Sequence, residues 1–252
     1  MIEVDGFSKS YGAAAKSKAV DGLTFTVAPG AILGLVGPNG AGKTTTLRAI
    51  AGILRPSGGT IRVAGFDVVK EPKKAKRELA LVPDTPNPYE LLTVREHLEF
   101  VRLAYGTKSR DPEELLLRFE LDKKRDELCG SLSRGMRQKL AICCALLHEP
   151  KALLLDEPLT GLDPHGTLEM REAIVQAAGE GAAIIVSSHQ LELVERLCSR
   201  LLLMKDGRKV TEGTIDEIRA QVGAGPETTL EQLFFKVIEG RELGGRDPGT
   251  PA

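Results

Sequence analysis

The stretch that decides the fold reads Gly-Pro-Asn-Gly-Ala-Gly-Lys-Thr at residues 37–44, between the apolar run 31–36 and the helix-compatible run 44–50. A buried strand, a glycine-rich loop and a helix in this order are typical of a loop that binds phosphate. The glycines let several backbone N–H groups point inward, and the helix N-terminus adds the positive end of its dipole. A chance glycine turn is the alternative, but the flanking strand and helix favour a nucleoside triphosphate site. The residues we expect around the phosphates are Gly37, Pro38, Asn39, Gly40, Ala41, Gly42, Lys43, Thr44 and Thr45.

Within this motif the last two positions carry the charge chemistry. Lys43 is expected to reach the β- and γ-phosphates, and the Thr44 hydroxyl is expected to be a ligand of Mg²⁺. A carboxylate pair, Asp156-Glu157, follows the apolar run 152–155. A carboxylate at the end of a buried strand beside a phosphate loop is where the metal needs a second anchor. We therefore assign Asp156 to the metal and Glu157 to the attacking water as general base, although acidic strand ends are common in any α/β fold.

Bulk composition excludes several other classes of protein. Of 252 residues, 34 are Lys or Arg and 35 are Asp or Glu, and seven Phe, three Tyr and no Trp offer no row of aromatic rings for stacking bases. This balance predicts no nucleic-acid partner. The four cysteines form no C-x-x-C pattern and are expected to be reduced. Without a signal peptide or an apolar run long enough to cross a bilayer, the chain is expected to be cytoplasmic.

The order of elements predicts an α/β fold. Alternating segments near residues 2–7 and 23–27 indicate antiparallel strands, whereas 152–155 and 182–186 indicate buried parallel strands followed by helices. Between these parts, residues 93–147 read as helical from a capping box at Thr93 onward. We expect a P-loop NTPase core with a mainly parallel sheet, an N-terminal antiparallel β subdomain and an inserted all-helical subdomain. A single domain at 1–240 would comprise a core (1–84 and 148–220), a helical subdomain (85–147) and a C-terminal helix (221–240, with a capping box at Thr228), and 241–252 would be a disordered tail.

A second motif gives the chain a family resemblance. Residues 132–136 read Leu-Ser-Arg-Gly-Met and precede both an apolar helix and the pair Asp156-Glu157. A Ser-x-Gly at a helix start presents a hydroxyl and free N–H groups, which is a second anion site, although on its own it would equally be a helix cap. Together with the phosphate loop, this segment resembles the signature of the ATP-binding subunit of ABC (ATP-binding cassette) transporters. The resemblance covers nearly the whole chain.

The resemblance implies further site residues and a mechanism. Tyr11 would stack on adenine, Asp163 would belong to a loop that crosses to a second subunit, and His189 would contact the γ-phosphate. Two subunits, identical in the simplest case, would pack head to tail, each ATP with its Mg²⁺ lying between one phosphate loop and the other subunit's signature. The residues acting across this dimer would be Leu132, Ser133, Arg134, Gly135, Met136 and Asp163. A separate integral-membrane permease would dock on the helical block and on the proline-rich loop before it, where Tyr89, Leu91 and Leu92 lie, so that the protein would be peripheral on the inner face of the cell membrane.

The chain departs from the family pattern in two places. Asp84 stands where a glutamine is usual; it can still ligate Mg²⁺, but its charge would repel the γ-phosphate unless the metal offsets it or the loop lies further back. In the signature, Arg134 and Met136 replace glycine and glutamine, a version that resembles exporters of drugs, antibiotics or ions. The alternative function is a soluble ABC ATPase acting in an assembly process. A P-loop kinase is a third possibility, which would explain neither the signature nor His189.

Overall fold

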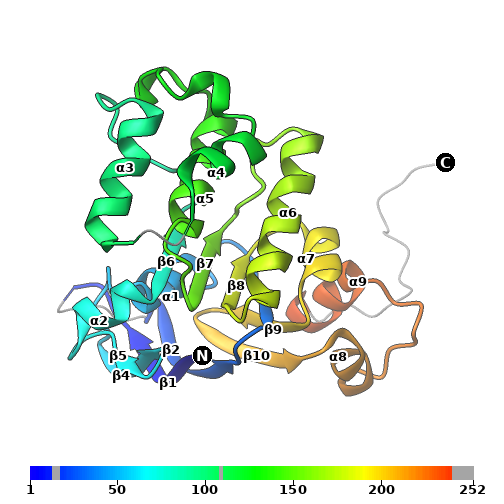
Figure 1. The fold of residues 1–252 in the computed structure, drawn as a ribbon. Coiled ribbons are helices and arrows are strands. Elements are labelled where there is room, and N and C mark those ends of the chain that lie inside the picture. Colours follow the sequence, from blue (N-terminus) through cyan, green and yellow to red (C-terminus); the bar gives the residue numbers. More distant parts are fainter. Residues whose placement is uncertain (13–17, 108–109, 240–252) are drawn as a thin grey trace.

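The computed structural model describes residues 1–12, 18–107 and 110–239, which form two sheets with helices packed around them (Figure 1). The strands are β1 (Ile2–Lys9), β2 (Val20–Val27), β3 (Ile32–Val36), β4 (Gly58–Val63), β5 (Phe66–Asp67), β6 (Leu79–Val82), β7 (Ala152–Asp156), β8 (Ala183–Ser187), β9 (Arg200–Lys205) and β10 (Arg208–Gly213). The helices are α1 (Lys43–Ile50), α2 (Pro72–Arg77), α3 (Val94–Tyr105), α4 (Pro112–Arg118), α5 (Arg134–Leu146), α6 (Pro164–Gly179), α7 (Leu191–Leu197), α8 (Ile215–Gln221) and α9 (Leu230–Phe234). Short 3-10 turns occur at Asp122–Lys124 and Cys129–Ser131.

The larger sheet has six strands in the order β10-β9-β3-β8-β7-β6, and only the β10–β9 pair is antiparallel. Every residue of β3, β7 and β8 is buried, which explains why these strands are almost entirely apolar. Alternate side chains of β7 and β8 point to opposite faces of the sheet and pack into two different hydrophobic cores. Leu153, Leu155 and Ile184 pack with α5 and α6, whereas Leu154 and Ile185 pack with α1 and the smaller sheet. The mainly parallel core predicted from the sequence is thus confirmed.

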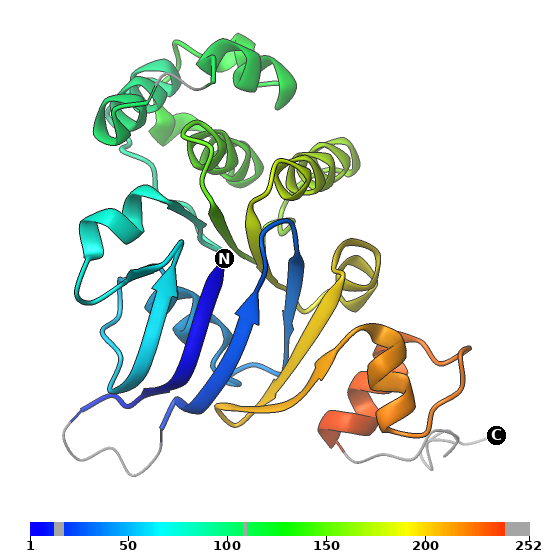
Figure 2. The same ribbon diagram turned by 60° about the horizontal axis from the view of Figure 1, so that its bottom comes forward.

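The smaller sheet confirms the predicted antiparallel N-terminal strands. Its order is β2-β1-β4-β5, with Ile2 opposite both Val27 and Val63. Apolar side chains alternate along β1 and β2 and face the second core, so this sheet packs against the face of the large sheet that carries α1. Figure 2 shows β1 and β2 (blue) running beside the large sheet.

The segment between β6 and β7 is helical, as the sequence predicts, and contains α3, α4 and α5. The capping box at the start of α3 forms with both bonds: Thr93 Oγ1 accepts a hydrogen bond from Glu96 N at 3.2 Å, and Glu96 Oε2 accepts one from Thr93 N at 2.8 Å. Helix α5 packs on the face of the large sheet near β6 and β7, and α3 and α4 lie further out, at the opposite end of the molecule from the C-terminal helices (Figures 1 and 2).

The C-terminal part corrects one prediction. The capping box lies at Thr229 and Gln232, one residue later than the Thr228 box predicted from the sequence, and α9 continues as a π-helical turn over Phe235–Glu239. The carbonyl oxygen of Thr228 accepts two hydrogen bonds from Arg219, at 2.8 and 3.0 Å, which holds it outside the helix. Helix therefore covers only part of 221–240. Residues 241–252, for which a disordered tail was predicted, lie outside the described residues, as does residue 240.

Candidate functional site

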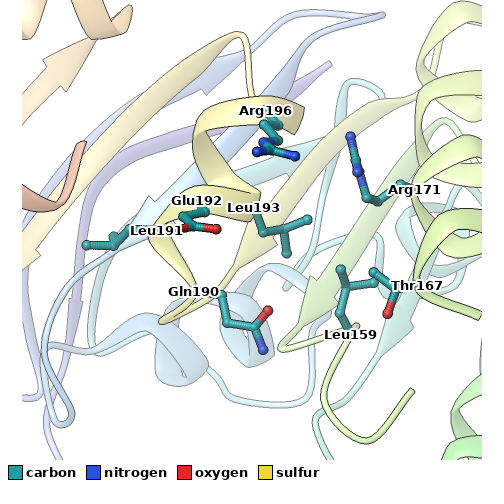
Figure 3. Close-up of a pocket in the computed structure, with 8 residues that line it drawn as sticks. All are labelled: Leu159, Thr167, Arg171, Gln190, Leu191, Glu192, Leu193 and Arg196. Carbon is teal, nitrogen blue, oxygen red and sulfur yellow. The ribbon is translucent and has the colours of Figure 1, made fainter. Parts of the chain in front are cut away.

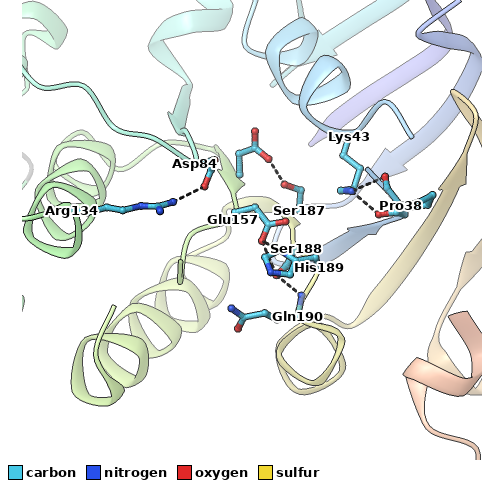
Figure 4. Close-up of polar contacts among 11 residues, drawn as sticks. Pro38, Lys43, Asp84, Arg134, Glu157, Ser187, Ser188, His189 and Gln190 are labelled. Carbon is cyan, nitrogen blue, oxygen red and sulfur yellow. Dashed lines mark hydrogen bonds and ion pairs between the residues drawn. The ribbon is translucent and has the colours of Figure 1, made fainter. Parts of the chain in front are cut away.

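The phosphate loop lies between β3 and α1, as its sequence context predicts. Gly40 and Gly42 have φ of +82° and +102°, which side chains other than glycine rarely tolerate. A β-carbon at Gly42 would also lie 2.7 Å from the Ala19 carbonyl oxygen. Lys43 Nζ donates to the carbonyl oxygens of Gly37, at 2.6 Å, and Pro38, at 3.2 Å (Figure 4). The ammonium group therefore lies over its own loop, where we expect a phosphate to bind.

The loop opens into a cavity of about 440 Å³. Asp84, from the loop after β6, and Asp156 and Glu157, from the end of β7, line this cavity together with the phosphate loop. The sequence predicted all three carboxylates for one site, and the structure brings them together. The cavity is lined by Ala19, Asn39, Gly40, Ala41, Gly42, Lys43, Thr44, Thr45, Asp84, Asp156 and Glu157. Ala19 was not predicted, and nothing in an isolated alanine could have signalled it.

Burial and neighbouring charges shift the pKa of Lys43 in opposite directions. Burial lowers the pKa of its ammonium group below the ordinary value, while the negative charges of Glu157 and Asp156 raise it. Burial is the larger effect. An anion entering the cavity would remove this conflict because it would supply the missing negative charge.

Asp156 is held by the neighbouring parallel strand. It is the last residue of β7 and pairs in register with Ser187, the last residue of β8. The buried Ser187 hydroxyl donates to Asp156 Oδ1 at 2.5 Å. This bond fixes the rotamer of Asp156 and leaves Oδ2 available to a ligand.

Glu157 has a left-handed backbone conformation, with φ of +50°, directly after the strand. Its Oε2 accepts a hydrogen bond from the Ser188 hydroxyl at 3.2 Å and lies 2.9 Å from Nδ1 of His189 (Figure 4). Ser188 Oγ in turn accepts a hydrogen bond from Gln190 N at 3.1 Å. With only 17% of its side chain exposed, the carboxylate is positioned by these neighbours rather than by water. The sequence singled out Glu157 and His189, but not the positioning contact of Ser188.

Tyr11 lies beside the first turn of α1. Its hydroxyl is within hydrogen-bond distance of Thr45 Oγ1, at 3.3 Å, and Lys9 Nζ lies 5.3 Å from the centre of its ring. The ring is exposed. An exposed aromatic ring next to the phosphate loop offers a surface on which a base can stack.

The segment resembling the signature begins α5. Ser133 is the N-cap, and its Oγ accepts a hydrogen bond from Met136 N at 3.3 Å, so the helix-cap interpretation is confirmed. Leu132 is buried and Met136 packs against the same core. A β-carbon at Gly135 would lie 2.7 Å from the carbonyl oxygen of Gly161, so the helix start packs closely on the loop before α6.

Asp163 caps the next helix. Its Oδ1 accepts a hydrogen bond from Gly166 N at 2.7 Å, with Pro164 in the first helical position. A second hollow, of about 400 Å³, lies between α6 and α7 and contains none of the predicted site residues (Figure 3). Its lining includes Arg171 and Arg196 over an aliphatic floor formed by Leu159 and Leu193.

The oxygen atoms at the main cavity fit a magnesium ion bound with a nucleotide. Within the described residues no group of three or more His, Cys, Asp or Glu side chains could enclose a metal ion. Mg²⁺ bound to a nucleotide needs only one or two protein oxygens, because phosphates and water supply the rest. Thr44, Asp156 and Asp84 line the same cavity and offer such oxygens.

A phosphate loop and two strand-end carboxylates around one cavity of a mainly parallel sheet define a P-loop nucleotide hydrolase. The model of the family described as "ABC transporter" matches residues 20–160. The Nod factor export ATP-binding protein I of Paraburkholderia xenovorans (strain LB400) is 37% identical over 97% of this chain and 83% of its own length. EcsA, the ABC-type transporter ATP-binding protein of Bacillus subtilis (strain 168), is 34% identical over 89% of this chain and 92% of its own.

Solved structures agree with these matches. The ATP-binding subunit of an ABC transporter superposes with a TM-score of 0.89 at 35% identity, covering 94% of this chain and 99% of that one. A dimeric cassette bound to ADP and Pi superposes with a TM-score of 0.77 at 23% identity, over 85% of this chain and 99% of that one, which supports the fold alone. The chain belongs to the ABC transporter family. It is an ATP-binding subunit that hydrolyses ATP to drive transport.

Proposed function

We propose that this chain drives export through a separate integral-membrane permease, as one of two identical cassettes that close around two molecules of Mg-ATP. The observation that carries the proposal is the Glu157 carboxylate, held by Ser188 and His189 at the cavity that the phosphate loop lines. The direction of transport rests on relatives such as the Nod factor export protein and the daunorubicin resistance protein DrrA3 of Streptomyces coeruleorubidus, which is 39% identical over 88% of this chain and 71% of its own length.

Within one chain, the residues around the cavity divide the work of binding. Lys43 leaves its loop carbonyls to contact the β- and γ-phosphates, and the neighbouring loop residues donate backbone N–H groups to them. Tyr11 stacks on the adenine ring. Thr44, Asp156 and Asp84 hold Mg²⁺, which when bound neutralises phosphate charge and orients the γ-phosphate.

Hydrolysis depends on Glu157 as the general base. Its carboxylate takes a proton from the water that attacks the γ-phosphorus, while the hydrogen bond from Ser188 and the close contact with His189 keep it in position. The side chain of His189 is 64% exposed, and its other ring nitrogen, Nε2, would contact the γ-phosphate while Nδ1 stays beside Glu157. The two residues therefore act as a pair, one accepting the proton and the other stabilising developing charge.

The second half of each site comes from the other subunit. Ser133, Arg134 and Gly135 of one chain face the nucleotide of its mate, while Leu132 and Met136 anchor this segment in the core of their own chain. Asp163 lies in the loop beside them. Because nucleotide bridges the two chains, ATP favours the closed dimer and its hydrolysis favours the open one. ATP hydrolysis can therefore drive transport without any contact between the ATP site and the transported molecule.

The permease docks on the helical block 85–147. Leu91 is 88% exposed and Tyr89 is 59% exposed, and the Tyr89 ring packs edge-on against Phe100 of α3 with 5.1 Å between ring centres. Leu103, also on α3, extends this exposed apolar surface. Within residues 1–12, 18–107 and 110–239, no helix combines the length and the apolar character that crossing a membrane requires. Docking would place the protein peripherally on the inner face of the cell membrane.

Affinity purification from detergent-solubilised membranes tests this proposal. The expected result is an integral-membrane protein that co-purifies with the chain and whose recovery falls when Leu91 is changed to Glu. Val210→Glu is the matched control, because Val210 is also exposed but lies on β10, away from the helical block. Recovery of no membrane protein, or only of soluble assembly factors, would favour the soluble ATPase instead.

A further inference from the structure

One ion pair joins the nucleotide cavity to the start of α5. Nη2 of Arg134 lies 3.3 Å from Oδ1 of Asp84 (Figure 4). Asp84 belongs to the loop after β6, at the edge of the large sheet, and Arg134 is the first residue of α5. The pair therefore links the core sheet to the helical segment, between residues 50 positions apart in the sequence.

Asp84 adds a charge that the cavity does not otherwise balance. It lines the cavity with two other carboxylates, Asp156 and Glu157, while Lys43 is the one cationic side chain in that lining among the described residues. A nucleotide γ-phosphate in the same space would face all three carboxylates. Mg²⁺ offsets part of this charge, but a third carboxylate remains repulsive unless a cation accompanies it.

Arg134 is directed toward Asp84 by close packing on the loop before α6. A β-carbon at Gly161, whose φ is +82°, would lie 3.4 Å from Cδ and 3.6 Å from Nε of Arg134. The aliphatic part of the arginine thus runs over the Gly161 backbone. Its neighbour Gly135 approaches the same backbone, so both residues fix the start of α5 there. The guanidinium reaches Asp84 from this supported position.

We propose that Arg134 is a positioning residue for the nucleotide site of its own chain. Its guanidinium neutralises the Asp84 carboxylate and holds Oδ1, which leaves Oδ2 for the metal side of the cavity. This inference rests on the proposed function, because it places a γ-phosphate beside Asp84. It gives Arg134 a task within the chain, distinct from any contact that the α5 N-terminus makes with the nucleotide of the other subunit.

Nucleotide titrations of the monomer separate these two tasks. At protein concentrations where light scattering shows a monomer, the other subunit's nucleotide is absent, and only the effect through Asp84 remains. Arg134→Met should weaken ATP binding roughly three- to tenfold, the range for unit charges about 6 Å apart at an effective dielectric constant of about 40 to 80. ADP lacks the γ-phosphate, and its affinity should change less than about twofold because charge interactions weaken with distance.

A second substitution identifies the route of the effect. In the double variant Arg134→Met with Asp84→Asn, ATP affinity should return to within about twofold of Asp84→Asn alone, since no uncompensated carboxylate is left. Arg134→Lys keeps the charge and should bind ATP like the wild type. The matched control is Arg95→Met, which breaks the exposed ion pair of Arg95 with Asp126, at 2.9 Å, outside the cavity. Arg95→Met should leave the affinities for ATP and for ADP unchanged.

Several outcomes would overturn the inference. Unchanged ATP affinity in Arg134→Met would show that Asp84 needs no counter-charge, and an equal loss for ATP and ADP would indicate a general distortion of the site. A loss that Asp84→Asn does not relieve would place the effect elsewhere on Arg134. If the wild-type monomer bound no ATP at this site, as judged by an unchanged Lys43→Ala titration, the proposed function itself would fail, independently of Arg134.

Discussion

Replacing Glu157 with Gln tests the centre of the proposed chemistry with little change of shape. The amide oxygen of Gln can still accept the hydrogen bond that Ser188 Oγ now donates to Glu157 at 3.2 Å, so the loop should keep its conformation. The backbone strain at φ of +50° is the same for both residues. What is lost is a proton acceptor. General bases contribute about 10²- to 10⁴-fold to rate, which corresponds to about 2.7–5.4 kcal/mol in the activation barrier.

Three measurements on the purified variant give the result. Phosphate release at saturating Mg-ATP should fall by about two to four orders of magnitude. Calorimetry should show ATP binding at least as tight as in the wild type, because a negative charge near the γ-phosphate has been removed. Size-exclusion chromatography with ATP should show a stable dimer. Glu99→Gln makes the same chemical change on α3, outside the cavity, and should leave turnover intact. If Glu157→Gln hydrolyses ATP at the wild-type rate, the assignment of the base is wrong.

Three further variants test the loop, the helix packing and two partly buried histidines. Lys43→Ala should weaken ATP binding roughly 10- to 150-fold, the range for a lost charged hydrogen bond, and an unchanged calorimetric affinity would contradict the phosphate site. Gly135→Ala places a methyl group 2.7 Å from a carbonyl oxygen and should cost about 1–3 kcal/mol in urea unfolding, whereas Gly179→Ala, with nothing within 4 Å, should cost none. Burial lowers the pKa of His97 and of His148 below the ordinary 6.5, so only the unfolded chain takes up these protons at first as the pH falls. The free energy of unfolding should thus decline as the pH falls through about 6.5, the ordinary pKa that the histidines regain in the unfolded chain, and changing both residues to Gln should flatten that decline; an unaltered slope would exclude them as its cause.

The sequence was sufficient to predict those features whose structure and chemistry are both determined by one short segment. The phosphate loop needs only its own glycines, the strand before it and the helix after it, and all three formed as predicted. The hairpin between β9 and β10 likewise follows from Asp206-Gly207, whose φ values of +49° and +76° match a tight turn. The buried strands β7 and β8 were recognisable because central strands of a parallel sheet are apolar on both faces.

Contacts between segments that lie far apart in the sequence could not be predicted in this way. Two overlapping capping patterns, from Thr228 and from Thr229, are equally good in sequence, and the choice depends on the hydrogen bonds from Arg219 and the burial of Leu230 and Leu233. The Ser188 contact with Glu157 joins residues 31 apart, on neighbouring strand ends. Such contacts are set by strand order, which periodicity does not encode.

The side chain of Ser133 can combine its structural role, as the cap of α5, with the proposed role at a nucleotide. Capping uses a lone pair of its oxygen, which accepts the hydrogen bond from Met136 N. The hydroxyl proton remains available as a donor, and the first N–H groups of α5 point the same way. An anion bound at the N-terminus of this 13-residue helix would therefore gain a hydroxyl, unpaired N–H groups and the dipole without disturbing the cap. The cap and the proposed signature role are thus not competing explanations: capping fixes the rotamer in which Ser133 would face a nucleotide presented by a second subunit.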